Sequence, residues 1–97
     1  MKWRWYISIS AVEQYMEIAG LRGELEDTNP DFILAQNALG ELSLTAKPAP
    51  TAQTRSGAEI YRGKVTIRGQ RRRIECTVNP YPRVEGDLPQ LLRVRLK

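Results

Sequence analysis

The sequence contains no histidine, a single cysteine and no long apolar run. Without histidine, and with Cys76 as its one thiol, the chain lacks the ligands of a zinc site and the base of a Ser-His-Asp triad. No run of about 18 apolar residues is present, and the N-terminal Met-Lys-Trp-Arg-Trp-Tyr lacks the apolar stretch of a secretory signal. We therefore expect a cytoplasmic protein with no metal, no cofactor and no membrane partner.

The two halves of the chain carry opposite charges. The first 50 residues contain four Lys/Arg and seven Asp/Glu, and the last 47 contain eleven and four, so the net charges are −3 and +7. The length of 97 residues, 41% hydrophobic and 27% charged, predicts one domain covering 1–97. The positive half indicates an anionic partner, either RNA or DNA or an acidic protein.

The segment 59–78 has the pattern of a β-hairpin. Gly69-Gln70 fits a two-residue type II′ loop, because glycine supplies the positive φ of its first position. That turn places Val65 opposite Ile74 and Lys64 opposite Glu75. It gives the hairpin one basic face and one apolar face. The apolar face consists of Tyr61, Val65, Ile67, Ile74, Cys76 and Val78, which makes Cys76 a buried, unreactive thiol.

The N-terminal half predicts one strand and two helices. Alternation over 3–9 indicates a strand, and Ser10 and Glu13 fit a capping box that starts a helix of about ten residues ending at Gly20 or Gly23. Asn29, Pro30 and Asp31 (29–31) have the pattern of a second helix start, and Pro48 sets the latest end of that helix.

The remaining segments are one connection, one loop and a last strand. Segment 47–57 has no periodicity and is expected to connect the helices to the hairpin, whereas 79–89, with three prolines, is expected to be a loop. Alternation from Leu92 predicts the last strand. The order β-α-α-β-β-β predicts an α+β fold with two N-terminal helices on one face of a mostly antiparallel, twisted sheet. Its predicted core is Trp3, Trp5, Ile7, Val12, Met16, Phe32, Leu39, Val65, Ile67, Ile74, Cys76, Val78 and Val94.

The basic sheet face is the candidate binding site. Its arginines and lysines could hold several phosphates, and Tyr61, Tyr81 and the prolines of the 79–89 loop could add stacking. The alternative is a solvated face, because an antiparallel sheet commonly exposes one side to water. The candidate residues are Arg62, Lys64, Arg68, Arg71, Arg73, Arg93 and Arg95, with Lys97 beside them and Tyr81 from the loop.

The element order with a basic sheet resembles the RelE/ParE-like toxin fold, in which two N-terminal helices pack on an antiparallel sheet. Residues 7–17, Ile-Ser-Ile-Ser-Ala-Val-Glu-Gln-Tyr-Met-Glu, also look like the strand-to-helix entry of a small group related to those toxins. Ala11, Glu13 and Glu17 match that pattern, whereas Ser10 stands in place of its histidine. Gln14 and Ile18 stand where the pattern has arginine.

The resemblance implies a bacterial or phage RNA-targeting protein of the toxin-antitoxin type. Any catalysis would be that of a metal-independent endoribonuclease, in which Arg71, Arg73 or Arg93 stabilises phosphate charge and Tyr61 or Tyr81 orients the substrate. The alternative function is a non-enzymatic interaction module, such as a phage or mobile-element accessory protein that binds an acidic host protein or an antitoxin.

Overall fold

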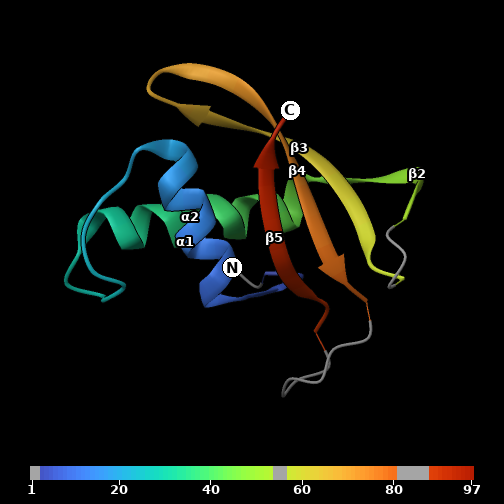
Figure 1. Ribbon diagram of the computed structural model, residues 1–97, viewed down its shortest axis with the longest axis horizontal. Helices are drawn as coiled ribbons and strands as arrows, with labels where there is room; N and C mark the ends of the chain where they lie inside the picture. The colour runs from blue at the N-terminus through green and yellow to red at the C-terminus, as the bar shows by residue number, and fades with distance from the viewer. Residues whose placement is uncertain (1–2, 54–56, 81–87) are drawn as a thin grey trace.

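A computed structural model of the protein describes residues 3–53, 57–80 and 88–97. Two helices and five strands form an α+β structure (Figure 1). The elements in chain order are β1 (Tyr6–Ile7), α1 (Ile9–Ala19), α2 (Pro30–Thr45), β2 (Lys47–Gln53), β3 (Glu59–Ile67), β4 (Gln70–Asn79) and β5 (Gln90–Leu96).

The five strands form one sheet in the order β1-β5-β4-β3-β2. β1 is parallel to β5 and the other neighbouring pairs are antiparallel, so the sheet is mixed and only largely antiparallel. β2 lies in the segment that was expected to be a plain connection, and that expectation is wrong for Lys47–Gln53. Prolines 48 and 50 did not prevent this strand, because β2 is at the edge of the sheet, where a missing N–H need not break the ladder.

The first strand is shorter than its alternation predicts because α1 starts early. The helix N-cap is Ser8, whose Oγ accepts a hydrogen bond from the Ala11 N–H at 3.1 Å. The capping box predicted at Ser10 is therefore wrong, since the earlier hydroxyl takes the cap position. The helix ends at Gly20, the first of the two predicted positions, which has the left-handed φ of 70°.

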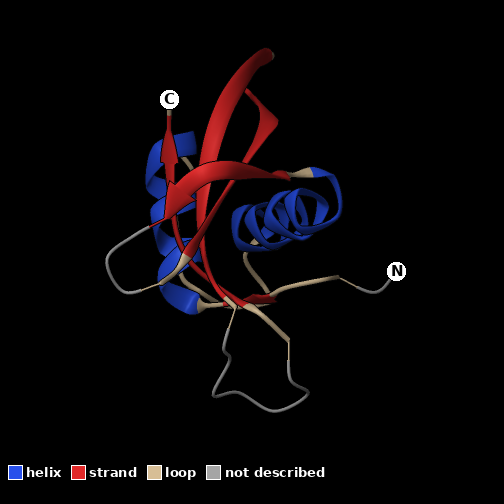
Figure 2. Cartoon of the chain, turned by 90° about the vertical axis from the view of Figure 1, so that its right-hand side faces the viewer, coloured by secondary structure: helices blue, strands red, loops and turns tan. Residues whose placement is uncertain are grey.

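The second helix begins as predicted. The Asn29 side chain accepts a hydrogen bond from the Asp31 N–H at 3.1 Å, and Pro30 is the first helical residue. α2 ends at Thr45, before Pro48. The two helices run in clearly different directions over the sheet (Figure 2).

The hairpin turn is Arg68-Gly69 and not Gly69-Gln70. Both residues have positive φ, 51° and 79°, as a type I′ loop requires. Gly63 consequently pairs with Ile74, and Lys64 pairs with Arg73 rather than with Glu75. The register differs from the prediction by two residues. Because two is the side-chain period of a strand, the residues within β3 and β4 keep their predicted faces, whereas Arg68 moves into the turn.

One hydrophobic core lies between the helices and the inner face of the sheet. Trp5 is buried as predicted, whereas Trp3 and Ile7 are partly buried. Trp3 lies against Gly40 of α2, where an added Cβ would come within 2.1 Å of the indole. Leu91 is fully buried in β5, next to a register shift in the β4–β5 ladder. The other predicted core residues are all buried: Val12, Met16, Phe32, Leu39, Val65, Ile67, Ile74, Cys76, Val78 and Val94.

Candidate anion-binding site

The outer face of the sheet, the side away from the helices, is strongly cationic. Apolar side chains of β3, β4 and β5 point to the core, so the alternate positions of these strands point outward. Glu75 is the single carboxylate among the outward positions of these three strands. The outward cations, all exposed, are Arg62, Lys64, Arg71, Arg73, Arg93, Arg95 and Lys97.

Glu75 is nearly buried and joins three of these cations. Its side chain is 9% exposed, and its carboxylate lies 3.0 Å from the Arg95 guanidinium, 3.5 Å from Arg62 Nε and 3.7 Å from Lys97 Nζ. A carboxylate held away from water requires such partners. One negative charge faces three positive ones, so the cluster keeps a net positive charge while its side chains are held in place.

A shallow depression, which we call the cationic depression, lies beside this cluster. It has a volume of about 270 Å³ and is lined by the side chains of Arg62, Lys64, Arg73 and Lys97. Its floor is the main chain of the Gly63–Ile74 pair, because both residues occupy inward positions: the Ile74 side chain is buried in the core, and a side chain at Gly63 would point toward Leu42. The ammonium and guanidinium groups around this floor supply many N–H donors and no acceptor.

Lys64 and Arg73 occupy directly opposed positions on β3 and β4. Like charges at opposed positions destabilise a sheet, because their Cβ atoms are only about 5 Å apart. An anion bound between the two side chains would remove that repulsion. The depression therefore has the charge and the donors to bind a phosphate group, in bidentate fashion where Arg73 takes part.

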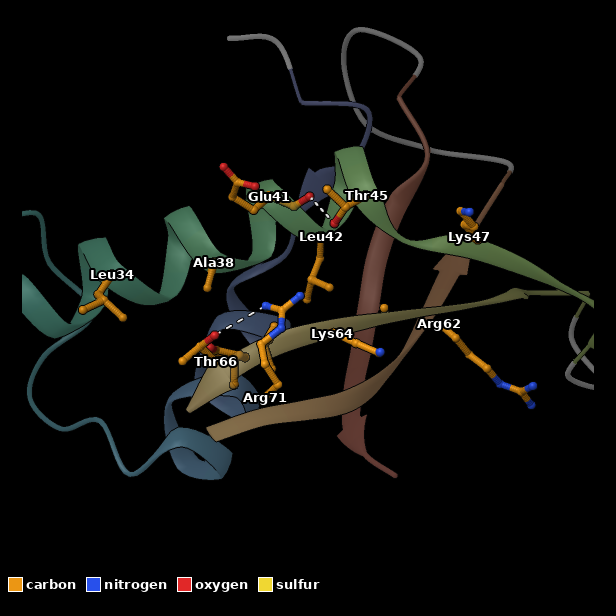
Figure 3. A pocket seen from close by; sticks show the side chains of 13 residues that line it. Leu34, Ala38, Glu41, Leu42, Thr45, Lys47, Arg62, Lys64, Thr66 and Arg71 are labelled. Carbon is orange, nitrogen blue, oxygen red and sulfur yellow. Dashed lines mark hydrogen bonds between the residues drawn. The ribbon is translucent and has the colours of Figure 1, made fainter. Parts of the chain in front are cut away.

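Two of the predicted site residues lie elsewhere or serve another contact. The guanidinium of Arg68 lies beside Gly20 at the C-terminus of α1, where an added Cβ would be 2.2 Å from Nη2. A cation at this position offsets the negative end of the helix dipole. Arg71 starts from an outward position of β4, but its side chain extends over the strand edge toward α2, and its Nη1 donates a hydrogen bond to Thr66 Oγ1 at 3.4 Å (Figure 3).

Two other predicted residues lie outside the depression, one on the outer face and one on the inner face. Arg93 is exposed on β5 opposite Thr77, outside the depression. Tyr61 lies on the inner face, with its ring centroid 5.0 Å from that of Trp5, so it does not stack beside the cations. Tyr81 lies outside the described residues.

A second hollow, the α2–β3 groove, opens between α2 and the edge of β3 (Figure 3). It has a volume of about 530 Å³. Leu34 and Ala38 line its helix side, and Lys47 lies at the end where β2 begins. Lys47 was not among the predicted site residues, because no strand was expected in its segment. Arg62, Lys64 and Arg71 from the hairpin also line this groove.

The titratable core groups are unsuited to neutral-pH chemistry. Cys76 is buried as predicted, and this burial, with a smaller effect from Glu75, raises the pKa of its thiol to about 12, which favours the protonated form at neutral pH. Burial also raises the pKa of Tyr15.

The described residues contain no group of three or more Cys, Asp and Glu placed to hold a metal ion. Neither described helix has the length and apolar character needed to cross a membrane.

Comparisons with protein families, curated proteins and solved structures found no match to this chain.

Proposed function

We propose that the protein binds nucleic acid through the outer face of its sheet, as an RNA-targeting protein of RelE-like type would. One observation carries this proposal: Lys64 and Arg73 face each other across the floor of the cationic depression, with Arg62 and Lys97 at its sides. The free protein bears the repulsion between these charges, and a bound phosphate relieves it. Glu75 pairs with Arg62 and Lys97 but with neither Lys64 nor Arg73.

The extent of the face favours a polymer over a single small anion. Outward side chains two residues apart along a strand are about 7 Å apart, roughly twice the axial rise per phosphate of one nucleic-acid strand. Arg93 and Arg95 continue the positive charge along β5 beyond the depression. A chain of regularly spaced phosphates could therefore contact several of these cations at once.

Filter binding of a labelled single-stranded RNA and of a DNA of the same sequence tests the proposal. The double variant Lys64→Gln/Arg73→Gln should bind more weakly and show a shallower dependence on salt, by about 0.7 in log–log slope for each lost phosphate contact. Arg22→Gln is the matched control, because Arg22 is exposed in the connection between α1 and α2, away from the sheet. Its slope should stay that of the wild type.

Two results would refute the proposal. One is the absence of binding to either polymer at low salt. The other is an equal loss of affinity in the double variant and in Arg22→Gln after allowance for the charges removed, which would show that net charge acts without a defined site. Exposed substitutions of this kind change the free energy of unfolding by less than about 0.5 kcal/mol, so the folded fraction should be unchanged.

The ribonuclease alternative is tested separately by expression in a bacterial host. Growth arrest that Arg71→Ala or Arg73→Ala relieves, together with cleaved RNA on a denaturing gel, would support a RelE-like endoribonuclease. Harmless expression with intact RNA would leave a binding protein without nuclease activity.

A further inference from the structure

β3 has an edge that β2 covers only in part. β2 pairs with β3 from Gln53 opposite Glu59 to Lys47 opposite Arg62, and the described strands provide no partner for 63–67 on that side. In an antiparallel strand every second residue directs its N–H and C=O toward the same neighbour. The stretch from Gly63 to the hairpin turn therefore presents a row of main-chain groups that an incoming strand could pair with.

The α2–β3 groove lies directly along this edge (Figure 3). Its helix wall extends from Leu34 to Thr45, a length of about 16 Å, which matches about five residues of extended chain. Leu34 is 55% exposed and Ala38 is partly exposed, so this wall offers apolar surface to a ligand. The volume of about 530 Å³ is large enough for a short peptide segment.

The charge of the groove selects the ligand. Four cations line it, Lys47, Arg62, Lys64 and Arg71, against the single carboxylate of Glu41. A strand added to β3 would point alternate side chains outward, on the side of Lys64, and the others inward, toward α2. The ligand that fits is an extended segment in which acidic and apolar residues alternate.

We propose that the α2–β3 groove binds an extended peptide of alternating acidic and apolar residues, supplied by a partner protein, as an added strand on β3. The site is distinct from the cationic depression and does not depend on nucleic-acid binding, although Arg62 and Lys64 line both hollows. Main-chain hydrogen bonds would provide the affinity, and the two alternating sets of side chains would provide the specificity.

Synthetic peptides of about seven residues, labelled with a fluorophore and capped at both ends, test the geometry by fluorescence anisotropy. A peptide of alternating glutamate and valine should bind at least about tenfold tighter than one of the same composition with its glutamates and valines in separate blocks. Two N-methylated versions carry methyl groups on alternate residues, in the two possible phases. One phase should abolish binding and the other should leave it unchanged, because only every second N–H faces β3.

Protein variants test the location. Ala38→Arg fills the groove from α2, whereas Asn37→Arg adds the same charge at the adjacent exposed position, which does not line it. Ala38→Arg should weaken binding of the alternating peptide about tenfold, and Asn37→Arg should leave it within about twofold of the wild type. Ala38→Arg should bind RNA as the wild type does, because position 38 is not on the outer face. The peptide assay and the RNA assay therefore test the two proposals independently.

Three results would overturn the strand-addition proposal. Equal binding of the alternating and block peptides would show that attraction is purely electrostatic. Equal tolerance of both N-methylation phases would exclude main-chain pairing with β3. Equal effects of Ala38→Arg and Asn37→Arg would place the peptide elsewhere. The first two measurements use the wild-type protein, so they remain decisive even if Ala38→Arg fails to fold.

Discussion

Replacing Glu75 with glutamine should lower the stability of the fold and raise its affinity for nucleic acid. The substitution removes three ion pairs whose cationic partners, Arg62, Arg95 and Lys97, are 52%, 72% and 41% exposed in their side chains. Water screens such partners, so each pair contributes about 0.2–1 kcal/mol. We expect the free energy of unfolding to fall by about 1–2 kcal/mol, measured by urea denaturation with an unchanged m-value.

The affinity should move in the opposite direction because Glu75 repels the phosphates that its neighbours attract. A phosphate at roughly 6 Å from the carboxylate, with the dielectric constant of water, is repelled by about 0.7 kcal/mol, so its removal should tighten binding about threefold. Filter binding at low salt measures this change, with Arg22→Gln as the reference for a distant charge. Weaker binding by a folded Glu75→Gln protein would refute this reasoning, because it would show that the carboxylate acts mainly by positioning its three cations.

Two further predictions concern the core. Gly63→Ala should lower the free energy of unfolding by about 1–3 kcal/mol, because the new Cβ would lie 2.7 Å from Leu42 Cδ2. The double variant Gly63→Ala/Leu42→Ala should lose less stability than the two single variants together. A Gly63→Ala protein more stable than the wild type would contradict this contact. Since the pKa of Cys76 is raised to about 12 in the folded protein, the native state retains a proton that the unfolded state loses above about pH 9. The free energy of unfolding should then fall by about 1.4 kcal/mol per pH unit over that range, and Cys76→Ala should reduce this slope; equal slopes would contradict the role of the thiol.

The faces of the sheet were predictable from the sequence, but the pairing of its strands was not. Alternation alone places Val65, Ile74 and Cys76 inward, and it does so for any register that differs by an even number of residues. The turn decides among these registers. Both Gly69-Gln70 and Arg68-Gly69 are acceptable two-residue loops. The second one requires a left-handed Arg68, at a cost of about 1–2 kcal/mol, and its contact with Gly20 is a long-range feature that no local pattern contains.

The edge strand β2 was missed for a similar reason. Prolines 48 and 50 and the absence of alternation argue against a strand in an interior position, yet an edge strand tolerates both. The sheet order that makes β2 an edge was not available from local sequence. The α2–β3 groove and Lys47 could not be predicted without it, whereas the outer-face cations could, because they required only the parity of the hairpin and of β5.

The number of arginines in the chain overstates the positive charge available to a ligand, because two of them, one from each half, lie at the helix ends. Neither helix has a basic residue in its own last turn. Arg4 meets the end of α2, where its guanidinium donates hydrogen bonds to the carbonyls of Ser43 and Ala46, and Arg68 meets the end of α1 at Gly20. These arginines offset the negative ends of the helix dipoles and are held there by the fold.

The cations of the outer face differ in how far neighbouring negative charge compensates them. Arg62, Arg95 and Lys97 share the carboxylate of Glu75, whereas Lys64 and Arg73 form no ion pair within the described part of the chain, and Arg73 lies between two cations, Lys64 on β3 and Lys97 at the end of β5. A ligand anion gains most where the free protein has the least compensation, because there it adds attraction and removes repulsion together. The pair Lys64 and Arg73 should therefore dominate anion binding on this face, and substitutions at Arg95 should matter less, although the residue carries the same charge and its side chain is 72% exposed.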